Sequence, residues 1–560
     1  MRRMVAFLLA AVLVMSLLAG CGGGQTLDEK TTAAPEQTTQ GGTEETQGET
    51  QGETKGEEES TEAPKMEIQY PLTDAGKLTW YVKSGIDVHT DYVEASESPF
   101  HSYLPKATGV SIEWRMVPIG GNADTDYNLV LLEPELPNIM TGLDLRYEEL
   151  FEGGLIYDLT PYLEEYAPDY WAWLNEDEKR LKEVQLYNGE IVYFASGVEE
   201  LNTCSYGPML RKDWLDECGL EIPYTLDEWE VVLTAFRDRY GIAPLTAQKP
   251  IWNGMFGMAA GTGAMGGFGF RTYRENGEIK CAQTQEEWKE LIVTMADWYA
   301  KGLIDPDVGT VKKEGVLTKA ANGEVGFVIS DEALTTRIPL ETSKIDPEAE
   351  WIPIPYPVPN KGDQPKFTRY EGMNSDHATV ITTSCSEEEL ITAIKLLNFG
   401  YTEYGKNVWN FGEENVSWYY DENGVVQLTD LVINDPKGKT NAINKYSPMN
   451  DSQAPSIKTN RFAELRYEQI TVDAFEVWGG NSLWYDNYMI PTLRFTAEDL
   501  ETILDMEDKF GNFLGTFAAK CVKGEHDIVA EWDYMINELN SMGLQEYLSI
   551  LQAAYDRVYK

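Results

Sequence analysis

Positive charge is scarce in this sequence of 560 residues. Asp and Glu number 93 against 45 Lys and Arg, which gives a formal net charge of −48. Binding to phosphate backbones needs clustered positive charge, so we expect no nucleic-acid partner. An anionic small ligand is disfavoured for the same reason, whereas a neutral ligand such as a sugar is indifferent to the sign of the charge.

Motifs for catalysis, metals and disulfides are also missing. No histidine pair has the spacing of zinc ligands, and no G-x-S-x-G motif marks a nucleophile. The cysteines after Cys21 are five, an odd number without a C-x-x-C pair, which is not the pattern of a disulfide scaffold. A G-x-G-x-x-G match at 261–266 is not placed between a strand and a helix, as a dinucleotide site requires. We therefore expect no enzyme activity, no metal and no cofactor.

An unbroken apolar run of membrane character occurs only near the amino terminus. Arg2 and Arg3 precede the run Met4–Met15, which is shorter than the ~20 residues of a spanning helix. We interpret residues 1–20 as a secretory signal peptide. The following Leu18-Ala19-Gly20-Cys21 looks like a bacterial lipobox, so Cys21 is predicted to carry a lipid. An ordinary signal peptide with an accidental cysteine is the alternative.

Residues 21–67 are predicted to be the lipidated cysteine followed by a disordered tether. The stretch 22–65 is mostly Gly, Thr, Gln, Glu, Ser, Pro and Ala, with eleven acids against three lysines. It cannot bury enough apolar surface to fold, and as a coil it would span roughly 35–40 Å. We therefore expect a protein that is lipid-anchored at the outer face of the cell membrane.

The rest of the chain has the pattern of α/β lobes with largely parallel sheets. Hydroxyl caps followed by an acid three residues later predict helices beginning at Thr225, Thr284, Ser386 and Thr496. Strand-like segments alternate with these helices, at 77–82, 111–117, 138–143, 190–195, 324–330, 351–358 and 378–383. Asn-Gly pairs at 188–189, 276–277 and 423–424 predict hairpin turns.

Aromatic residues are abundant, with 15 tryptophans and 31 tyrosines. Trp229, Trp288 and Trp298 fall at core spacing on helices. Another group lies in Asn- and Gly-rich contexts that we interpret as loops, where indole rings suit stacking on sugars: Trp252, Trp409, Trp418 and Trp484. The alternative is that each of these rings fills a lobe core.

Several motifs resemble those of extracellular solute-binding proteins of carbohydrate ABC importers, family 1, in the lipoprotein subgroup common in Gram-positive bacteria. The similarity runs across 68–560, with landmarks "GGLIYDLTPYLEEYAPDY", "YNGEIVYF" and "WYAKGLIDPD". The most specific is R-K-D-W-L…G-L…P-x-T-x-x-E-W at 211–229. Two departures occur: Pro137-Asn138 where many members have Pro-Asp, and a short loop after the 225–240 helix that lacks the oxygen ligands of a calcium site.

The resemblance implies a two-lobe fold of the periplasmic-binding-protein type, in the cluster of larger sugar-binding members, with a hinge between the lobes. We place one lobe at 68–198 plus 365–410 and the other at 199–364 plus 411–560. The family's ligand contacts are not a fixed motif, so position alone nominates the candidate ligand-binding residues: Asp144, Tyr206, Trp252, Asn374, Trp409 and Trp484.

Three functions compete at this point. The first is a monomeric lipoprotein that captures an oligosaccharide and presents it to ABC permease subunits. The second is a binding lipoprotein for another solute such as a peptide, or one linked to a sensor. The third is a surface glycoside hydrolase, which hydrolysis of a bound oligosaccharide would establish.

Overall fold

A computed structural model of this protein describes residues that all fall within Pro64–Lys560. These residues are 67–85, 97–118, 121–143, 145–186, 188–199, 204, 206–248, 256–367, 374–449, 455–479 and 483–560. The predicted signal peptide, Cys21 and nearly all of the predicted tether lie outside them, as do Asp144 and Trp252. Within these ranges, no helix combines the length and apolar character needed to cross a membrane.

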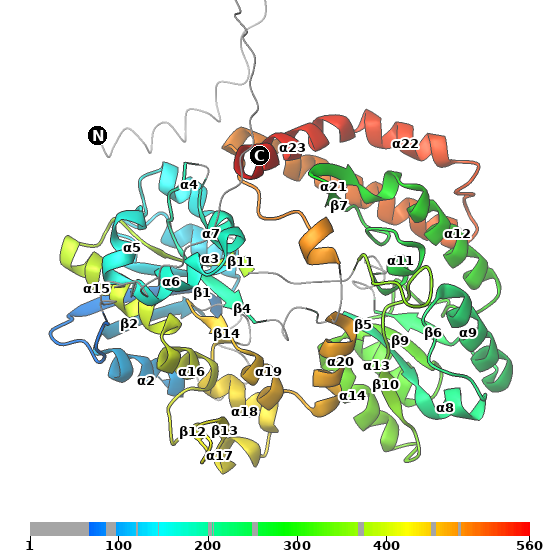
Figure 1. Ribbon diagram of the computed structural model, residues 1–560, viewed down its shortest axis with the longest axis horizontal. Helices are drawn as coiled ribbons and strands as arrows, with labels where there is room; N and C mark the ends of the chain where they lie inside the picture. Colours follow the sequence, from blue (N-terminus) through cyan, green and yellow to red (C-terminus); the bar gives the residue numbers. More distant parts are fainter. Residues whose placement is uncertain are drawn as a thin grey trace, which may run out of the picture. The chain divides into compact units, whose positions relative to one another are not determined.

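A six-stranded sheet in the order β14-β4-β11-β3-β1-β2 forms the centre of the first lobe (Figure 1). All its strands run parallel except β11, which pairs antiparallel with β3 and β4. The predicted strand at 190–195 begins only at Phe194 and continues to Val198, whereas the others on this sheet are confirmed. The strands are β1 (Lys77–Gly85), β2 (Ser111–Val117), β3 (Ile139–Leu143), β4 (Phe194–Val198), β11 (Asn374–Ile381) and β14 (Ile457–Lys458).

One hydrophobic cluster, centred on Trp80, Tyr81 and Tyr170, joins this sheet to its helices and to a small hairpin of β12 (Trp418–Tyr420) and β13 (Val426–Leu428). The helices of this lobe are α2 (Pro99–Thr108), α3 (Ala123–Val130), α4 (Tyr147–Glu152), α5 (Thr160–Tyr166), α6 (Pro168–Asn175), α7 (Glu178–Val184), α15 (Glu387–Asn398), η4 (Phe399–Tyr401), α16 (Glu403–Phe411), α17 (Asp430–Ile433), α18 (Lys439–Tyr446) and α19 (Asn460–Arg466).

The second lobe has a four-stranded sheet in the order β10-β5-β9-β6, with β5 antiparallel to both of its neighbours. Side chains alternate between its two faces: Leu210 and Phe327 join one hydrophobic cluster, and Met209 and Val328 join another. Figure 1 shows α14 and α20 on one side of this sheet and α9 on the other. The strands are β5 (Tyr206–Arg211), β6 (Leu245–Ala247), β9 (Phe327–Asp331) and β10 (Trp351–Pro353).

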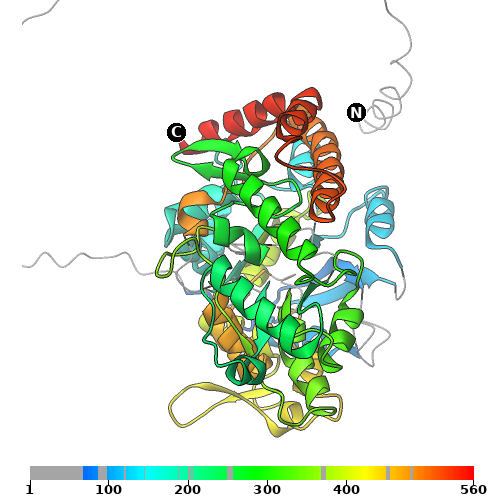
Figure 2. The same cartoon turned by 90° about the vertical axis from the view of Figure 1, so that its right-hand side faces the viewer.

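Carboxyl-terminal helices complete the second lobe by packing beside α12, where Trp288 lies 6.3 Å from Trp532 between ring centroids (Figure 2). Its remaining elements are α8 (Lys212–Glu217), α9 (Leu226–Tyr240), α11 (Phe256–Thr262), β7 (Thr272–Glu275), β8 (Glu278–Cys281), η3 (Ala282–Thr284), α12 (Glu286–Ala300), α13 (Lys313–Ala321), α14 (Glu332–Ser343), α20 (Gln469–Gly479), η6 (Trp484–Tyr488), α21 (Ala497–Val522), α22 (Trp532–Ser541) and α23 (Leu544–Tyr559).

Capping side chains set the starts of several helices. Thr225 and Ser386 form complete capping boxes, and the Thr496 hydroxyl accepts from the Asp499 N–H. The predicted cap at Thr284 is wrong by one residue, because Gln285 is the N-cap residue of α12. Thr284 instead closes the short helix η3, and its hydroxyl donates to the Cys281 carbonyl. Positive φ at Asn276 and at the glycine after it confirms the turn between β7 and β8.

One stretch of the chain belongs to a different lobe from the one expected from the sequence. Residues 411–462, which the sequence analysis groups with the second lobe, pack in the first-lobe cluster through Phe411, Trp418 and Phe462. The short strand β14 also pairs with β4 of the first sheet. The reason is that apolar side chains of this stretch, such as Val432 and Ile443, pack into the first-lobe cluster.

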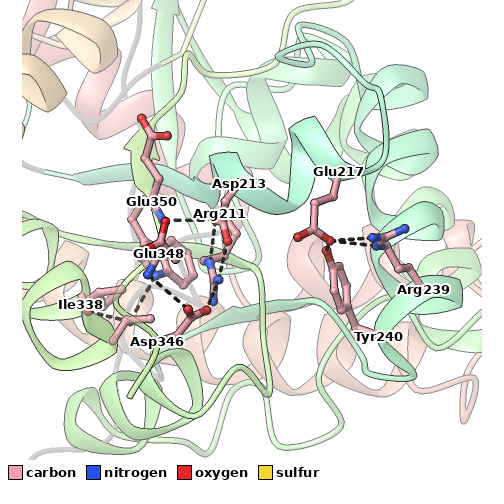
Figure 3. Close-up of polar contacts among 11 residues, drawn as sticks. Arg211, Asp213, Glu217, Arg239, Tyr240, Ile338, Asp346, Glu348 and Glu350 are labelled. Carbon is pink, nitrogen blue, oxygen red and sulfur yellow. Dashed lines mark hydrogen bonds and ion pairs between the residues drawn. The ribbon is translucent and has the colours of Figure 1, made fainter. Parts of the chain in front are cut away.

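The motif at 211–229, which is the most specific part of the family resemblance, forms an ion-pair network at the carboxyl end of β5 (Figure 3). The Arg211 guanidinium is 2% exposed and donates to both carboxylate oxygens of Asp213, at 2.8 and 2.5 Å. It also donates to Asp346 at 2.8 Å and lies 4.5 Å from the ring of Trp214. The motif therefore ties β5, α8 and the segment after α14 together.

Arg239 serves as the control for a stability test of Arg211. It makes an exposed ion pair with Glu217 (Figure 3). We expect Arg211→Met to lower the free energy of unfolding by about 3–5 kcal/mol, because it leaves two carboxylates without their buried partner. Arg239→Met should change it little. Denaturant unfolding checks both, and equal losses for the two variants would contradict the structural role of Arg211.

Arg494, between η6 and α21, connects the second lobe to the first. Its guanidinium is 3% exposed and donates to the Tyr147 hydroxyl at 2.9 Å and the Gln185 carbonyl at 3.0 Å. It also forms an ion pair with Glu148 at 3.2 Å. From the second lobe, Arg557 donates to the Arg494 carbonyl at 2.9 Å. The segment around Arg494 is thus bonded to both lobes.

Glu183 lies beside this connection with a buried carboxyl group. It is 3% exposed, its carbonyl accepts from Arg494, and among the described residues its Oε1 has no hydrogen-bond partner. Burial raises the pKa of Glu183 to about 7, against the opposing charge of Lys179. Because the folded chain holds the protonated form, this group stabilises the fold fully below a pH of about 4.3, and the contribution is lost as pH rises through about 7.

Replacing this carboxyl should remove that pH dependence. Between a pH of about 4 and about 8, the stability of the wild-type chain relative to Glu183→Gln should fall by roughly 3 kcal/mol. The control is Glu178→Gln on the same helix, where the side chain is 82% exposed. Urea unfolding at several pH values measures the difference. Parallel pH profiles for wild type and Glu183→Gln would show that Glu183 is not held protonated.

Candidate ligand-binding site

The carboxyl ends of β6 and β9 lie at one edge of the second sheet. Strand β6 ends at Ala247 and is followed by Gln248, and β9 ends at Asp331. Because β5 runs in the opposite direction, its first residue, Tyr206, pairs with Asp331. Ligands of open α/β sheets bind beyond the carboxyl ends of the strands. Gln248, Asp331 and Tyr206 therefore lie where a ligand of this sheet is expected.

Asp331 is the central polar group of this edge. It is 9% exposed, and its Oδ2 accepts from Gln248 Nε2 at 2.8 Å and from Lys313 Nζ at 2.9 Å. Although Asp331 is the N-cap residue of α14, its side chain does not bond the helix. In the described part of the chain, its other oxygen, Oδ1, is buried without a hydrogen-bond partner. The carboxylate of Asp331 is thus held in place through Oδ2, and Oδ1 remains as an acceptor that these two donors do not use.

Glu332 follows Asp331 in the chain, and its carboxyl is affected by a charge from the first lobe. Burial raises the pKa of the Glu332 carboxyl, with a further contribution from the charge of Asp331, and the charges of Arg466 and Lys313 act against this shift. Arg466 ends α19 of the first lobe, is 8% exposed, and donates to the Tyr467 hydroxyl at 2.6 Å. Its Nε is buried and has no hydrogen-bond acceptor among the residues described. This edge therefore combines groups from both lobes.

The first sheet presents a comparable edge where β4 and β14 end. The Glu199 N–H donates to the Lys458 carbonyl at 2.9 Å, and the Glu199 carboxylate accepts from the Asn460 N–H at 2.6 Å. The antiparallel strand β11 begins here with Asn374, which pairs with Ser196. Ser196 is 1% exposed, and its hydroxyl has no partner within the described ranges.

Three passages in the sequence connect elements of the first lobe with elements of the second. The passages are 198–206 from β4 to β5, 353–374 from β10 to β11, and 466–469 from α19 to α20. The last passage connects a helix whose Phe462 belongs to the first core with a helix whose Ala474 belongs to the second lobe. Tyr206 and Asn374 lie at the ends of two of these passages.

Of the six residues that the sequence nominates, the structure places two at these edges. Tyr206 begins β5 beside Asp331, and Asn374 begins β11 on the first sheet. Asp144 and Trp252 fall outside the described residues. Tyr206 and Asn374 thus remain candidates for ligand contacts.

The two nominated tryptophans that the structure describes, Trp409 and Trp484, do not lie at the sheet edges. Trp409 is 3% exposed in helix α16, with its ring 4.7 Å from that of Phe100, and Trp484 is 2% exposed at the start of η6, 4.8 Å from Phe367. The loop positions expected for them are wrong, as they are for Trp418, which is fully buried in β12. These rings fill the lobe cores, which is the alternative that the sequence left open.

The sequence analysis missed the polar group around Asp331. Gln248 directly follows one short buried strand and Asp331 is the last residue of another, so a polar residue at the end of a strand was an available signal. Lys313 and Arg466 had no such signal, because they reach the site from helices distant in sequence. The G-x-G-x-x-G stretch begins inside α11, at Gly261, and is not a strand-to-helix turn.

Asn138 stands where many members of the family that this chain resembles have aspartate. Its side chain has a structural role. Its Oδ1 accepts from the Thr79 N–H at 2.8 Å and from the Thr79 hydroxyl at 2.9 Å. The amide therefore fastens the segment before β3 to β1. In the described residues, no group of three or more His, Cys, Asp or Glu side chains is arranged to hold a metal ion.

A separate groove of about 820 Å³ lies on the second lobe between α9, α11 and α12. Its charged walls include Asp227, Lys289 and Glu290, while its one tryptophan, Trp298, is buried and donates to Glu230 at 2.9 Å. The residues that line this groove do not include either sheet edge. It would not couple a ligand to movement of the lobes, so the sheet edges are the better candidate site.

No family model matches the chain. The chain is 21% identical over 503 residues to the fructooligosaccharide ABC transporter substrate-binding protein FusA of Streptococcus pneumoniae, a match that covers 81% of this chain and 86% of FusA. It is 26% identical to lipoprotein LipO of Bacillus subtilis over 262 residues, 44% of this chain, and the match spans 49% of LipO's length. The extracellular solute-binding protein of Bifidobacterium longum subsp. infantis superposes with a TM-score of 0.69 at 20% identity, over 87% of this chain and 99% of that chain.

The resemblance inferred from the sequence motifs is confirmed at the level of these relatives, since they include substrate-binding proteins of ABC transporters and an extracellular solute-binding protein. The two-lobe α/β fold is confirmed by the structural similarity, which covers nearly all of the solved chain. FusA and the Bifidobacterium longum protein are named as binding proteins and not as enzymes.

Proposed function

We propose that this chain is a membrane-anchored extracellular lipoprotein that captures an oligosaccharide between its two lobes and delivers it to the permease subunits of an ABC importer. The observation that carries the proposal is the similarity to FusA along most of both chains. FusA is named as the binding protein for fructooligosaccharide. The present chain would act in the same way on an oligosaccharide, as a monomer and without hydrolysing it.

The geometry of the two sheet edges supports this proposal. Each edge offers buried hydrogen-bonding groups, Asp331 and Gln248 on the second sheet and Ser196 beside Asn374 on the first. A ligand that bonds to both edges favours the arrangement in which the lobes are close, because only there does it reach both sets of groups. Tyr206, at the passage from β4 to β5, is the aromatic residue best placed to contact it.

The proposed anchor is the lipid on Cys21, with residues 22–65 as the tether. It rests on the lipobox-like Leu18-Ala19-Gly20-Cys21 sequence, and one relative, LipO, is named as a lipoprotein. A lipid and a polar tether would keep the lobes outside the cell and close to a permease in the same membrane.

The ligand class is tested by titrating the full-length, detergent-solubilised chain with neutral oligosaccharides, oligogalacturonate and a lysine-rich peptide by calorimetry. We expect saturable binding of at least one oligosaccharide and recovery of that oligosaccharide intact after prolonged incubation. Binding of the peptide alone would replace the oligosaccharide proposal with a peptide-binding one. Shortened products would instead establish a glycoside hydrolase.

The anchor has its own test. Cys21→Ala removes the thiol that would take the lipid, so the variant should either be released from the membrane or stay unprocessed. Fractionation of cells after labelling with a radioactive fatty acid measures both lipid and location, and Cys218→Ala is the control because this cysteine lies in the second lobe. A Cys21→Ala chain that still carried label in the membrane fraction would show that the anchor lies elsewhere.

A further inference from the structure

The backbone at Arg494 is fixed to the second lobe. The side chains on either side of it, Leu493 and Phe495, pack against a hydrophobic cluster of that lobe. Its carbonyl accepts from Arg557 of helix α23 at 2.9 Å. Because the stretch between η6 and α21 begins and ends in the second lobe, no backbone passage connects the lobes at this point.

The Arg494 guanidinium, in contrast, is bonded to the first lobe. Its Nε donates to the Gln185 carbonyl at 3.0 Å, and one terminal nitrogen donates to the Tyr147 hydroxyl at 2.9 Å and the Glu148 carboxylate at 3.2 Å. The other terminal nitrogen donates to the Glu183 carbonyl. We call these four residues the Arg494 socket. They belong to α4 and to the end of α7, so one side chain attaches the second lobe to two elements of the first.

This attachment is difficult to release. Withdrawal of the guanidinium would leave the buried Tyr147 hydroxyl and the carbonyl of the buried Glu183 without this donor, which is costly. An arginine also keeps its charge throughout the pH range of folded proteins, so deprotonation does not release it. Several rotatable bonds join the guanidinium to its backbone. The lobes can therefore change their angle while Arg494 stays in its socket.

Apolar packing beside the socket is incomplete. A cavity of about 80 Å³ lies next to Arg494, and both Leu186 of the first lobe and Phe495 of the second line it. A void removes contacts that the atoms around it would otherwise make. The attachment of the lobes at this point therefore depends mainly on the bonds of Arg494.

We infer that Arg494 is a positioning residue for ligand binding: through its socket it limits the arrangements of the two lobes and keeps the binding-competent arrangement populated. The inference rests on the proposed function, because it concerns a ligand held between the lobes. A protein with fewer accessible arrangements loses less freedom when the ligand orders it. When the competent fraction falls, the apparent affinity falls by the same factor.

Arg494→Met tests this role, because it keeps an extended side chain and removes every donor. We expect affinity for the oligosaccharide to fall at least about tenfold. The loss should be in the association rate, since a bound ligand itself holds the lobes together. A substitution that instead damages the ligand's own contacts acts mainly on the dissociation rate.

Two milder substitutions support this test. Arg494→Lys keeps the charge but not the planar set of donors, so its association rate should lie between those of wild type and Arg494→Met. Tyr147→Phe removes one acceptor from the first-lobe side of the same contact and should lower the association rate by a smaller factor. Tyr147→Phe also decides the question if Arg494→Met does not fold.

The matched control is Arg211→Met. Arg211 is an equally buried arginine, but its partners Asp213 and Asp346 lie in the same lobe as Arg211 itself. This substitution should cost stability and leave both rates of ligand binding unchanged. Thermal unfolding of every variant sets a temperature at which all of them are folded, and binding is compared there.

The full-length, detergent-solubilised chain is titrated with fructo-oligosaccharides, malto-oligosaccharides and oligogalacturonate. Surface plasmon resonance then gives both rates for each oligosaccharide that saturates the wild type. Amide hydrogen exchange without ligand, read by mass spectrometry, reports local opening. In Arg494→Met, exchange should become faster in 147–152 and 183–186 of the first lobe and in 489–496 of the second, whereas Arg211→Met should leave these segments unchanged.

The outcomes separate the inference from the function on which it rests. A lower association rate in Arg494→Met, without such a change in Arg211→Met, supports the inference. Unchanged or higher affinity in Arg494→Met overturns it, and so does a loss carried mainly by the dissociation rate. A wild-type chain that binds no oligosaccharide overturns the proposed function. Hydrogen exchange then decides on the attachment alone: faster exchange in both lobes supports it, and a change confined to the second lobe overturns it.

Discussion

The structure depends on the separation of its hydrophobic cores. The first-lobe cluster and the two clusters of the second lobe share no residue, and the two second-lobe clusters lie on opposite faces of one sheet. What we find between the lobes is polar: the bonds of Arg494 to Tyr147 and Gln185, and the charges around Asp331. Because burial of apolar surface is the main stabilising contribution in a fold, we expect each lobe to owe its stability mainly to its own hydrophobic core. Such an interface suits a protein that must close on a ligand and open again.

The placement of the family-like motif follows from the same separation. Arg211 and Asp213 lie at one end of β5, and Tyr206 lies at the other, beside Asp331. The motif therefore stabilises the second lobe without touching the ligand edge. A sequence motif of this kind identifies the fold well, while the specificity of the site depends on residues such as Gln248 and Arg466 that no motif contains.

The sequence predicted the fold because its signals are local. Capping boxes at Thr225 and Ser386, the Asn-Gly turn after β7, and alternating apolar strands each act within a few residues. The division into lobes was predicted less well, since 411–462 packs on the first core through contacts that span the whole chain. The site was harder still. The tryptophans were expected in loops on the grounds of neighbouring Asn and Gly, but Trp409 fills a gap between Trp80 and Phe100 that only the folded sheet creates. Asp331, Lys313 and Arg466 come together from three elements, and their proximity has no trace in local sequence.

The central claim is that the ligand is held between the carboxyl edges of the two sheets. A crystal structure of the chain with a bound oligosaccharide tests it most directly. The account predicts that the sugar lies within hydrogen-bond distance of Asp331 on the second sheet and of groups beside Ser196 on the first. A sugar bound in the groove between α9 and α12, with neither edge in contact, would contradict it.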